Sequence, residues 1–239
     1  MKKNMLIGMA VLLFSSVLWT QAAGKVNVGD KKVTREVGPF TEIELSVAAN
    51  LYLKQGNEHS LVLEGDEDEL EEIETQVQGE TLKIKHKKPF HFGSSKRITI
   101  YVTMKEIEEL SVGGSGKIEA ATPIQSEDLE LNVSGSGDIN IDELEASEVE
   151  SSISGSGDIR LAGNKQVNTL DCNISGSGEL HASGLKVGSA ELSLSGSGGC
   201  KVYVTDELDV DISGSGKVRY KGEPLVNASI SGSGRVESY

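Results

Sequence analysis

The sequence predicts an all-β protein: a right-handed parallel β-helix, or solenoid, with about 18–21 residues per coil and one short helix near its N-terminal end. Three observations predict this fold class. A Gly-Ser-Gly tripeptide recurs at a steady interval, apolar and polar residues alternate on both sides of each copy, and the same alternation runs through much of the sequence before the first copy. Alternation with a period of two is typical of strands that bury one face.

The first residues are typical of a secretory signal peptide. Two lysines precede an apolar run at residues 5–19, and the small residues Ala22 and Ala23 follow. We therefore expect residues 1–23 to be removed and the mature chain to be exported to the periplasm, the cell surface or the extracellular space. No Cys lies near the cleavage region to take a lipid, and no later segment reaches 18 apolar residues. The mature chain is thus expected to have no lipid anchor of that kind and no membrane span.

The chain is acidic and poor in aromatic residues. Its formal net charge is -14 over 239 residues, and removal of the signal peptide takes away two lysines and no acid, which leaves -16. Such a charge disfavours nucleic acid and anionic lipid as partners and favours cations or basic partners. An alternative interpretation is that the acidity only keeps an exported protein soluble.

Residues 24–105 are expected to form an N-terminal strand-rich cap and the first coils, because a solenoid needs an atypical end to close its core. A helix is predicted at residues 66–78, where Leu70, Ile73 and Val77 have helical spacing and acids occupy the first turn. The alternation predicts strands within residues 40–54, 60–64, 81–85 and 97–103.

Residues 106–239 hold the seven Gly-Ser-Gly copies, which are expected to be seven coils continuous with the cap as one domain. The last glycine of each copy is Gly116, Gly137, Gly157, Gly178, Gly198, Gly216 or Gly234. We expect these glycines to be structural, at corners where positive φ is needed. Strands on either side of each corner would stack at about 4.8 Å and bury their apolar faces against one another. Parallel crossovers of this kind are right-handed.

Seven positions before the last glycine, six of the seven coils carry an acid, and the seventh carries Asn227. These acids are Glu109, Glu130, Glu150, Asp171, Glu191 and Asp209. Stacking would align them as an outward column of carboxylates, which needs compensation because like charges side by side repel. The hypothesis is that the column recruits Ca²⁺, a hard cation that prefers oxygen ligands, or a basic partner. The alternative is a solvated face that discourages aggregation.

A basic segment at residues 85–96 stands out in this acidic chain. Its Lys87, Lys88, Phe90 and Phe92 are predicted to form an exposed contact loop for an acidic glycan or protein, or for the acidic column of another copy. The alternative is an ordinary surface loop.

Signals of catalysis are weak. Asp138 and Asp158, one position after the last glycine of their coils, could act as a carboxylate pair on a polysaccharide, but no His or Arg recurs beside them. The four histidines lack metal-ligand spacing, so no cofactor other than Ca²⁺ is expected. Cys172 and Cys200 fall in different inward columns, and we expect them to replace apolar side chains rather than form a disulfide.

Several segments together resemble a known family, the putative auto-transporter adhesin head GIN domain of exported bacterial proteins. They are the opening GPFTEIELSVAANLYLKQG, then LVLEGDEDELEEI and ETLKIK, and the successive SGSGDI and SGSGEL repeats. The resemblance implies a right-handed β-helix similar to pectate-lyase-like folds but without their catalytic residues, and a role in cell adhesion.

The sequence and the resemblance together favour a non-catalytic exported binding or adhesion module that presents polar columns on a rigid β-helix. Its partner would be a cell-surface glycan or protein. Two alternatives remain: a polysaccharide-active lyase or hydrolase on the same scaffold, and a structural spacer in a surface assembly. An enzyme would gather carboxylates and basic side chains in one groove, whereas a spacer would bind nothing.

Overall fold

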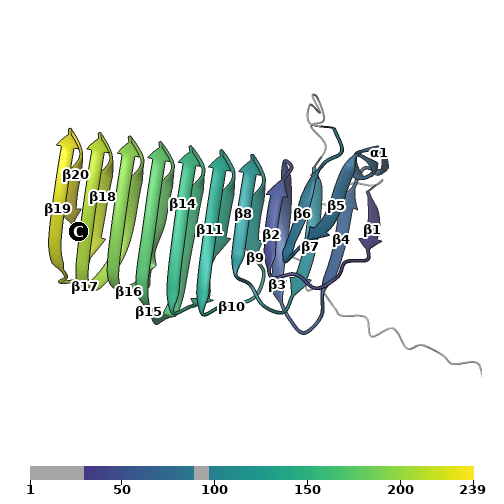
Figure 1. The fold of residues 1–239 in the computed structure, drawn as a ribbon, viewed down its shortest axis with the longest axis horizontal. Helices are drawn as coiled ribbons and strands as arrows, with labels where there is room; N and C mark the ends of the chain where they lie inside the picture. Colours follow the sequence, from purple (N-terminus) through teal and green to yellow (C-terminus); the bar gives the residue numbers. More distant parts are fainter. Residues whose placement is uncertain (1–29, 89–96) are drawn as a thin grey trace, which may run out of the picture.

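The structure is a computed structural model that describes residues 30–88 and 97–239. It is nearly all β, with 72% of residues in strands and 2% in helix, and it forms a β-solenoid of about six turns (Figure 1). The predicted fold class is thereby confirmed. The predicted signal peptide, together with Phe90 and Phe92, lies outside the described residues.

Twenty strands and one helix follow one another within residues 30–88 and 97–239. The elements before the first Gly-Ser-Gly corner are β1 Lys31–Arg35, β2 Glu42–Ser46, β3 Ala49–Gln55, β4 Ser60–Gly65, α1 Glu67–Glu71, β5 Ile73–Gln78, β6 Thr81–His86, β7 Ile98–Met104 and β8 Glu109–Gly114. The later strands are β9 Lys117–Ala120, β10 Ile124–Gln125, β11 Asp128–Gly135, β12 Asp138–Ile141, β13 Leu144–Glu145, β14 Glu148–Gly155, β15 Asp158–Gly176, β16 Glu179–Gly196, β17 Gly199–Gly214, β18 Lys217–Lys221, β19 Leu225–Gly232 and β20 Arg235–Ser238.

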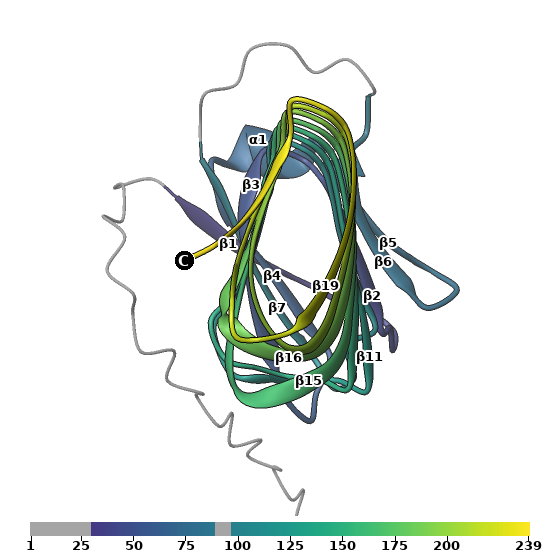
Figure 2. The same cartoon turned by 90° about the vertical axis from the view of Figure 1, so that its left-hand side faces the viewer.

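The repeats stack as parallel strands in register. Before the corners, β8, β11, β14, the ends of β15, β16 and β17, and finally β19 pair in succession. After the corners, β9, β12, the starts of β15, β16 and β17, β18 and β20 do the same. Viewed along the axis, the coils superimpose as one tall outline that is narrow at the Gly-Ser-Gly corner (Figure 2). Equivalent side chains therefore form rows along the axis.

The first strands add a coil beneath the repeats. β2 and β3 pair in parallel with β8 and β9, respectively. Beyond them the sheet becomes antiparallel, with β4 between β1 and β7 and with β5 and β6 as a hairpin. This end lies opposite β19 and β20 in Figure 1.

The predicted helix over residues 66–78 is wrong beyond its first half. The helix α1 covers only Glu67–Glu71, and β5 follows directly as a strand paired with β6. Ile73, Thr75 and Val77 form a period-two row of β-branched residues, which favour strands. Pairing with β6 selects this pattern over the helical spacing, and Leu70 and Ile73 are both buried in the resulting structure.

The core is a continuous row of aliphatic side chains along the axis. In the six coils before the last, the residue four positions before the last glycine is only 1–3% exposed. Ser151 is the one buried polar residue among those described, and its hydroxyl donates to the Asp171 carbonyl at 3.2 Å. Cys172 and Cys200 are buried and unbridged, with Sγ atoms 4.0 Å apart. The hydrogen bond with Cys172 and burial raise the pKa of the Cys200 thiol well above its usual value.

At the corners, the glycine that adopts positive φ is not the last one of each tripeptide, as expected, but the first. The first glycine of each tripeptide does so, as in Gly135 at 122° and Gly155 at 130°. The last glycine is required for a different reason, because the coils touch there. A Cβ on Gly157 would lie 2.1 Å from the Gly137 carbonyl oxygen. The corner backbone is also tied to the coil below, since the Ser156 N–H donates to the Gly135 carbonyl at 2.8 Å.

Candidate functional site

The six acids predicted to align form an in-register column. Glu109 pairs with Glu130, and the register continues through Glu150, Asp171 and Glu191 to Asp209. The column ends at Asn227 on one side and reaches one coil further than predicted on the other, because Glu42 of β2 pairs with Glu109. Sequence reasoning missed Glu42, although it stands before the alternating apolar residues of its strand as the other acids do.

A second polar row runs parallel to this column, two residues earlier on the same strands. It consists of Asp128, Glu148, Thr169, Ser189 and Glu207. Together with flanking residues, the two rows line an open groove of about 880 Å³ that crosses six coils. Eleven of the lining residues are acidic and none is basic. The groove, which we call the acidic groove, therefore concentrates negative potential along the axis.

The acids of the column receive hydrogen bonds from the amide and hydroxyl groups of neighbouring side chains. The Asn132 amide donates to Glu109 at 3.1 Å and to Glu130 at 2.7 Å, and the Asn227 amide donates to Asp209 at 2.9 Å. Within residues 30–88 and 97–239, Glu106 is the one acid of the eleven that forms an ion pair, with Lys105 at 3.4 Å, and no Lys, Arg or His pairs with the other ten. The carboxylates thus keep their charge available to an external partner.

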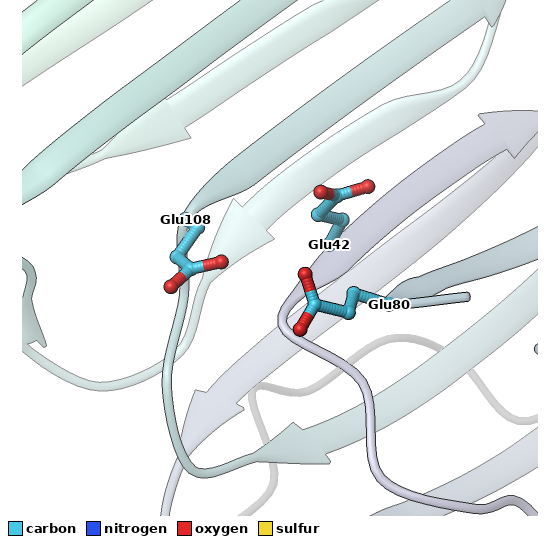
Figure 3. A group of neighbouring side chains, drawn as sticks. All are labelled: Glu42, Glu80 and Glu108. Atoms are coloured by element: carbon cyan, nitrogen blue, oxygen red, sulfur yellow. The ribbon is translucent and has the colours of Figure 1, made fainter.

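Three carboxylates meet where the acidic groove approaches the cap: Glu42 of the column, Glu108 of the groove lining, and Glu80. One oxygen each from Glu42, Glu80 and Glu108 lies within 4.8 Å of the others (Figure 3). They come from β2, from the turn between β5 and β6, and from the segment before β8. The Thr41 hydroxyl donates to Glu108 at 2.8 Å, which orients that side chain. Carboxylate oxygens in such a group are the donor type that Ca²⁺ prefers.

A hydroxyl-rich surface adjoins the acidic groove on the same strands. Two outward rows nearer the corner carry serine, asparagine and one aspartate, and they line a shallow depression of about 440 Å³. Ser154, Ser175, Ser195 and Ser213 form one of these rows in register. One face of the solenoid therefore presents carboxylates beside neutral hydrogen-bonding groups.

The two carboxylates weighed for catalysis make hydrogen bonds between adjacent coils. Asp138 and Asp158 are neighbours in register, and each accepts a hydrogen bond from the backbone of the next coil, at 3.3 Å from the Asp158 N–H and 3.1 Å from the Glu179 N–H. Asp158 also pairs with Arg160 at 2.8 Å. These contacts hold both carboxylates as acceptors between coils.

The predicted contact loop is described only in part. Lys87 and Lys88 are exposed, and the Lys88 ammonium lies 3.8 Å from a Glu72 carboxylate oxygen. The Lys87 N–H donates to the Glu72 carbonyl at 2.9 Å, so the two lysines, which follow β6, lie beside the C-terminal end of α1. The loop does not meet the acidic groove through these residues.

By class the protein is a β-solenoid with a long acidic groove and an adjacent hydroxyl-rich surface on the same strands. The chain belongs to the family described as the putative auto-transporter adhesin, head GIN domain, whose model matches residues 39–224. No curated protein matches the chain. No helix in the described ranges is long and apolar enough to cross a membrane.

Solved structures of similar proteins share the fold. A putative adhesin from Bacteroides fragilis has a TM-score of 0.83 at 22% identity, with 89% of this chain and 98% of that chain covered. A putative lipid binding protein from Parabacteroides distasonis has a TM-score of 0.72 at 27% identity, with the same coverage. A putative adhesin from Parabacteroides merdae has a TM-score of 0.72 at 24% identity, covering 89% and 97%.

Proposed function

We propose that the protein is a non-catalytic, exported adhesion module that binds a cell-surface glycan or protein through the acidic groove. The observation that carries this proposal is the set of eleven acids lining one groove, of which all but Glu106 have no ion-pair partner among the described residues. Family membership supports an adhesion-like role. The resemblance to exported proteins and the signal-like first residues support a location outside the cytoplasm.

The groove suits a partner that carries regularly spaced positive charge or exposes several hydroxyls. Its carboxylates recur once per coil, at about 4.8 Å, on a scaffold whose strands are hydrogen-bonded on both sides. A rigid row loses little conformational entropy on binding, so a repetitive ligand can use several weak contacts at once. The neighbouring serine rows would add neutral hydrogen bonds to such a ligand.

Calcium is the cation that this donor set fits best. Ca²⁺ takes six to eight oxygen ligands and accepts carboxylates, hydroxyls and water in flexible geometry. Bound at Glu42, Glu80 and Glu108, or along the column, it would neutralise part of the groove and leave positions open for glycan hydroxyls. We therefore include calcium in the test of function.

We expect the mature chain, residues 24–239, to bind some of the ligands on an array of glycans and surface proteins. Millimolar calcium should strengthen its binding to the glycans. A variant with E130Q, E150Q, D171N and E191Q should lose about tenfold or more in affinity, because four charges of the groove become neutral amides of the same size. Surface plasmon resonance on the array hits measures the change, and calorimetry with added Ca²⁺ measures the metal directly.

The matched control neutralises the same number of exposed acids elsewhere, with E58Q, E71Q, D142N and E143Q, and should bind like the unmodified protein. Equal loss in both variants would show a general charge effect and would reject the groove as the site. No heat and no rise in melting temperature with millimolar Ca²⁺ would remove calcium from the account. An absence of any binding would favour the structural spacer, and turnover of a bound polysaccharide would favour the enzyme.

A further inference from the structure

We propose that β19 and β20 form the contact surface of a symmetric dimer with a second copy of this chain. These two strands, the terminal edge, face the viewer in Figure 2. β19 pairs only with β17, and β20 pairs only with β18, so each leaves one side of its backbone without a strand partner among the described residues. Unpaired edge strands are templates for pairing with another chain.

The terminal edge exposes side chains that belong to the core rows. Ile230 is 44% exposed, whereas its equivalents in the preceding six coils are 1–3% exposed. Ala228, from another inward row, is exposed as well, and so is Leu225 at 68%, which continues the outward row of Glu207 as an apolar residue. The hydrophobic interior of the stack is therefore open at this face, and a second copy could cover it.

The β19 part of the terminal edge lacks the charges that usually protect an edge strand. β19 has no charged residue, while each strand that precedes it in the same row, from β8 to β17, carries at least one acid. Asn227 replaces the acid of the column and donates hydrogen bonds to Glu207 and Asp209. Residues 217–239 carry four basic and two acidic side chains, in a chain whose net charge is -14. Two such ends can approach without the repulsion that the acidic column would otherwise cause.

A single two-fold axis could pair both β19 and β20 with the same strands of the second copy. If Ala228 lies opposite its own copy in an antiparallel pair, Val226 of one chain lies opposite Ile230 of the other, so inward residues meet inward residues. If Val236 lies opposite its own copy, Arg235 of one chain lies opposite Glu237 of the other. Such self-complementarity is what an isologous interface requires.

The two strand pairs share this axis because their central residues face one another across the core. Ala228 occupies the same row as Cys172, and Val236 occupies the same row as Cys200. The sulfur atoms of these cysteines lie 4.0 Å apart across the core. The same rotation can therefore centre both β19 and β20 on their copies.

Charge reversal within the predicted pair tests the proposal by sedimentation equilibrium of residues 24–239. The unmodified chain should dimerise, and R235E or E237R alone should each weaken the dimer by about tenfold, since two attractive pairs become repulsive. Mixing the R235E and E237R chains should restore the affinity, because every cross-chain pair in the mixed dimer is again opposite in charge. Melting curves confirm that each variant keeps its fold.

A chain that remains monomeric at about 200 μM, a weak affinity for a specific dimer, would overturn the proposal. So would a dimer unaffected by either reversal, or a mixture no tighter than the single variants. Open-ended growth into filaments would also contradict it, since a two-fold contact closes after two copies.

Discussion

Replacing Gly157 with Ala should lower the free energy of unfolding by about 3 kcal/mol, at the upper end of the usual cost of overpacking. A methyl group there would lie 2.1 Å from the Gly137 carbonyl oxygen and 2.6 Å from a Val133 methyl. Both contacts belong to the coil below, and one of them is backbone, which cannot rotate away. The two coils would have to separate at the corner, where the Ser156 N–H bonds to Gly135.

Gly38 provides the matched control, because no atom lies within 4 Å of the Cβ that alanine would add there and its φ is not in the positive range. G38A should change stability by less than about 0.5 kcal/mol, as surface substitutions usually do. Urea denaturation followed by circular dichroism measures both variants. Similar stability of G157A and G38A would mean that the coils do not touch at the corner.

Replacing Ile153 with Ala should cost about 2–5 kcal/mol, the range for removing a large aliphatic side chain from a packed core. Ile153 is 1% exposed and lies between Val133 and Ile174 in the row before the corners. Neighbours from both adjacent coils surround the side chain, so the cavity cannot collapse without moving backbone on two sides.

Ile230 occupies the same row in the last coil and is 44% exposed, which makes I230A the matched control. At a protein concentration low enough to keep the chain monomeric, its cost should be less than half that of I153A, because fewer atoms lose contacts. Urea unfolding curves of the two variants give the comparison. Equal costs would place Ile153 and Ile230 in equivalent surroundings and would contradict the stacked core.

The stack and the acidic column could be predicted because a repeat acts as an alignment within one chain. Glu130, Glu150 and Asp171 recur at the interval of the coil, and regular parallel pairing carries that interval directly into space. Each local preference in the repeats agrees with the global fold.

The features that could not be predicted depend on contacts between segments that the repeat interval does not relate. Glu80 approaches Glu42 and Glu108 only through the cap hairpin, which the expected helix over residues 66–78 obscured. Sequence alone also could not separate the two corner glycines, since positive φ and close contact both require glycine. The groove arises from two rows at once, of which only one recurs as acids in nearly every coil.

Distances between spin labels on the corner serines test the stacking most directly. Cysteines introduced in pairs at Ser115 with Ser197, Ser215 or Ser233 lie on exposed corners, and the buried native thiols should remain unlabelled. With unlabelled protein added to suppress signals between chains, pulsed electron resonance should give about 19, 24 and 29 Å, one coil of about 4.8 Å apart at each step. Distances that fail to increase with the number of coils would contradict a single stack and, with it, the acidic groove.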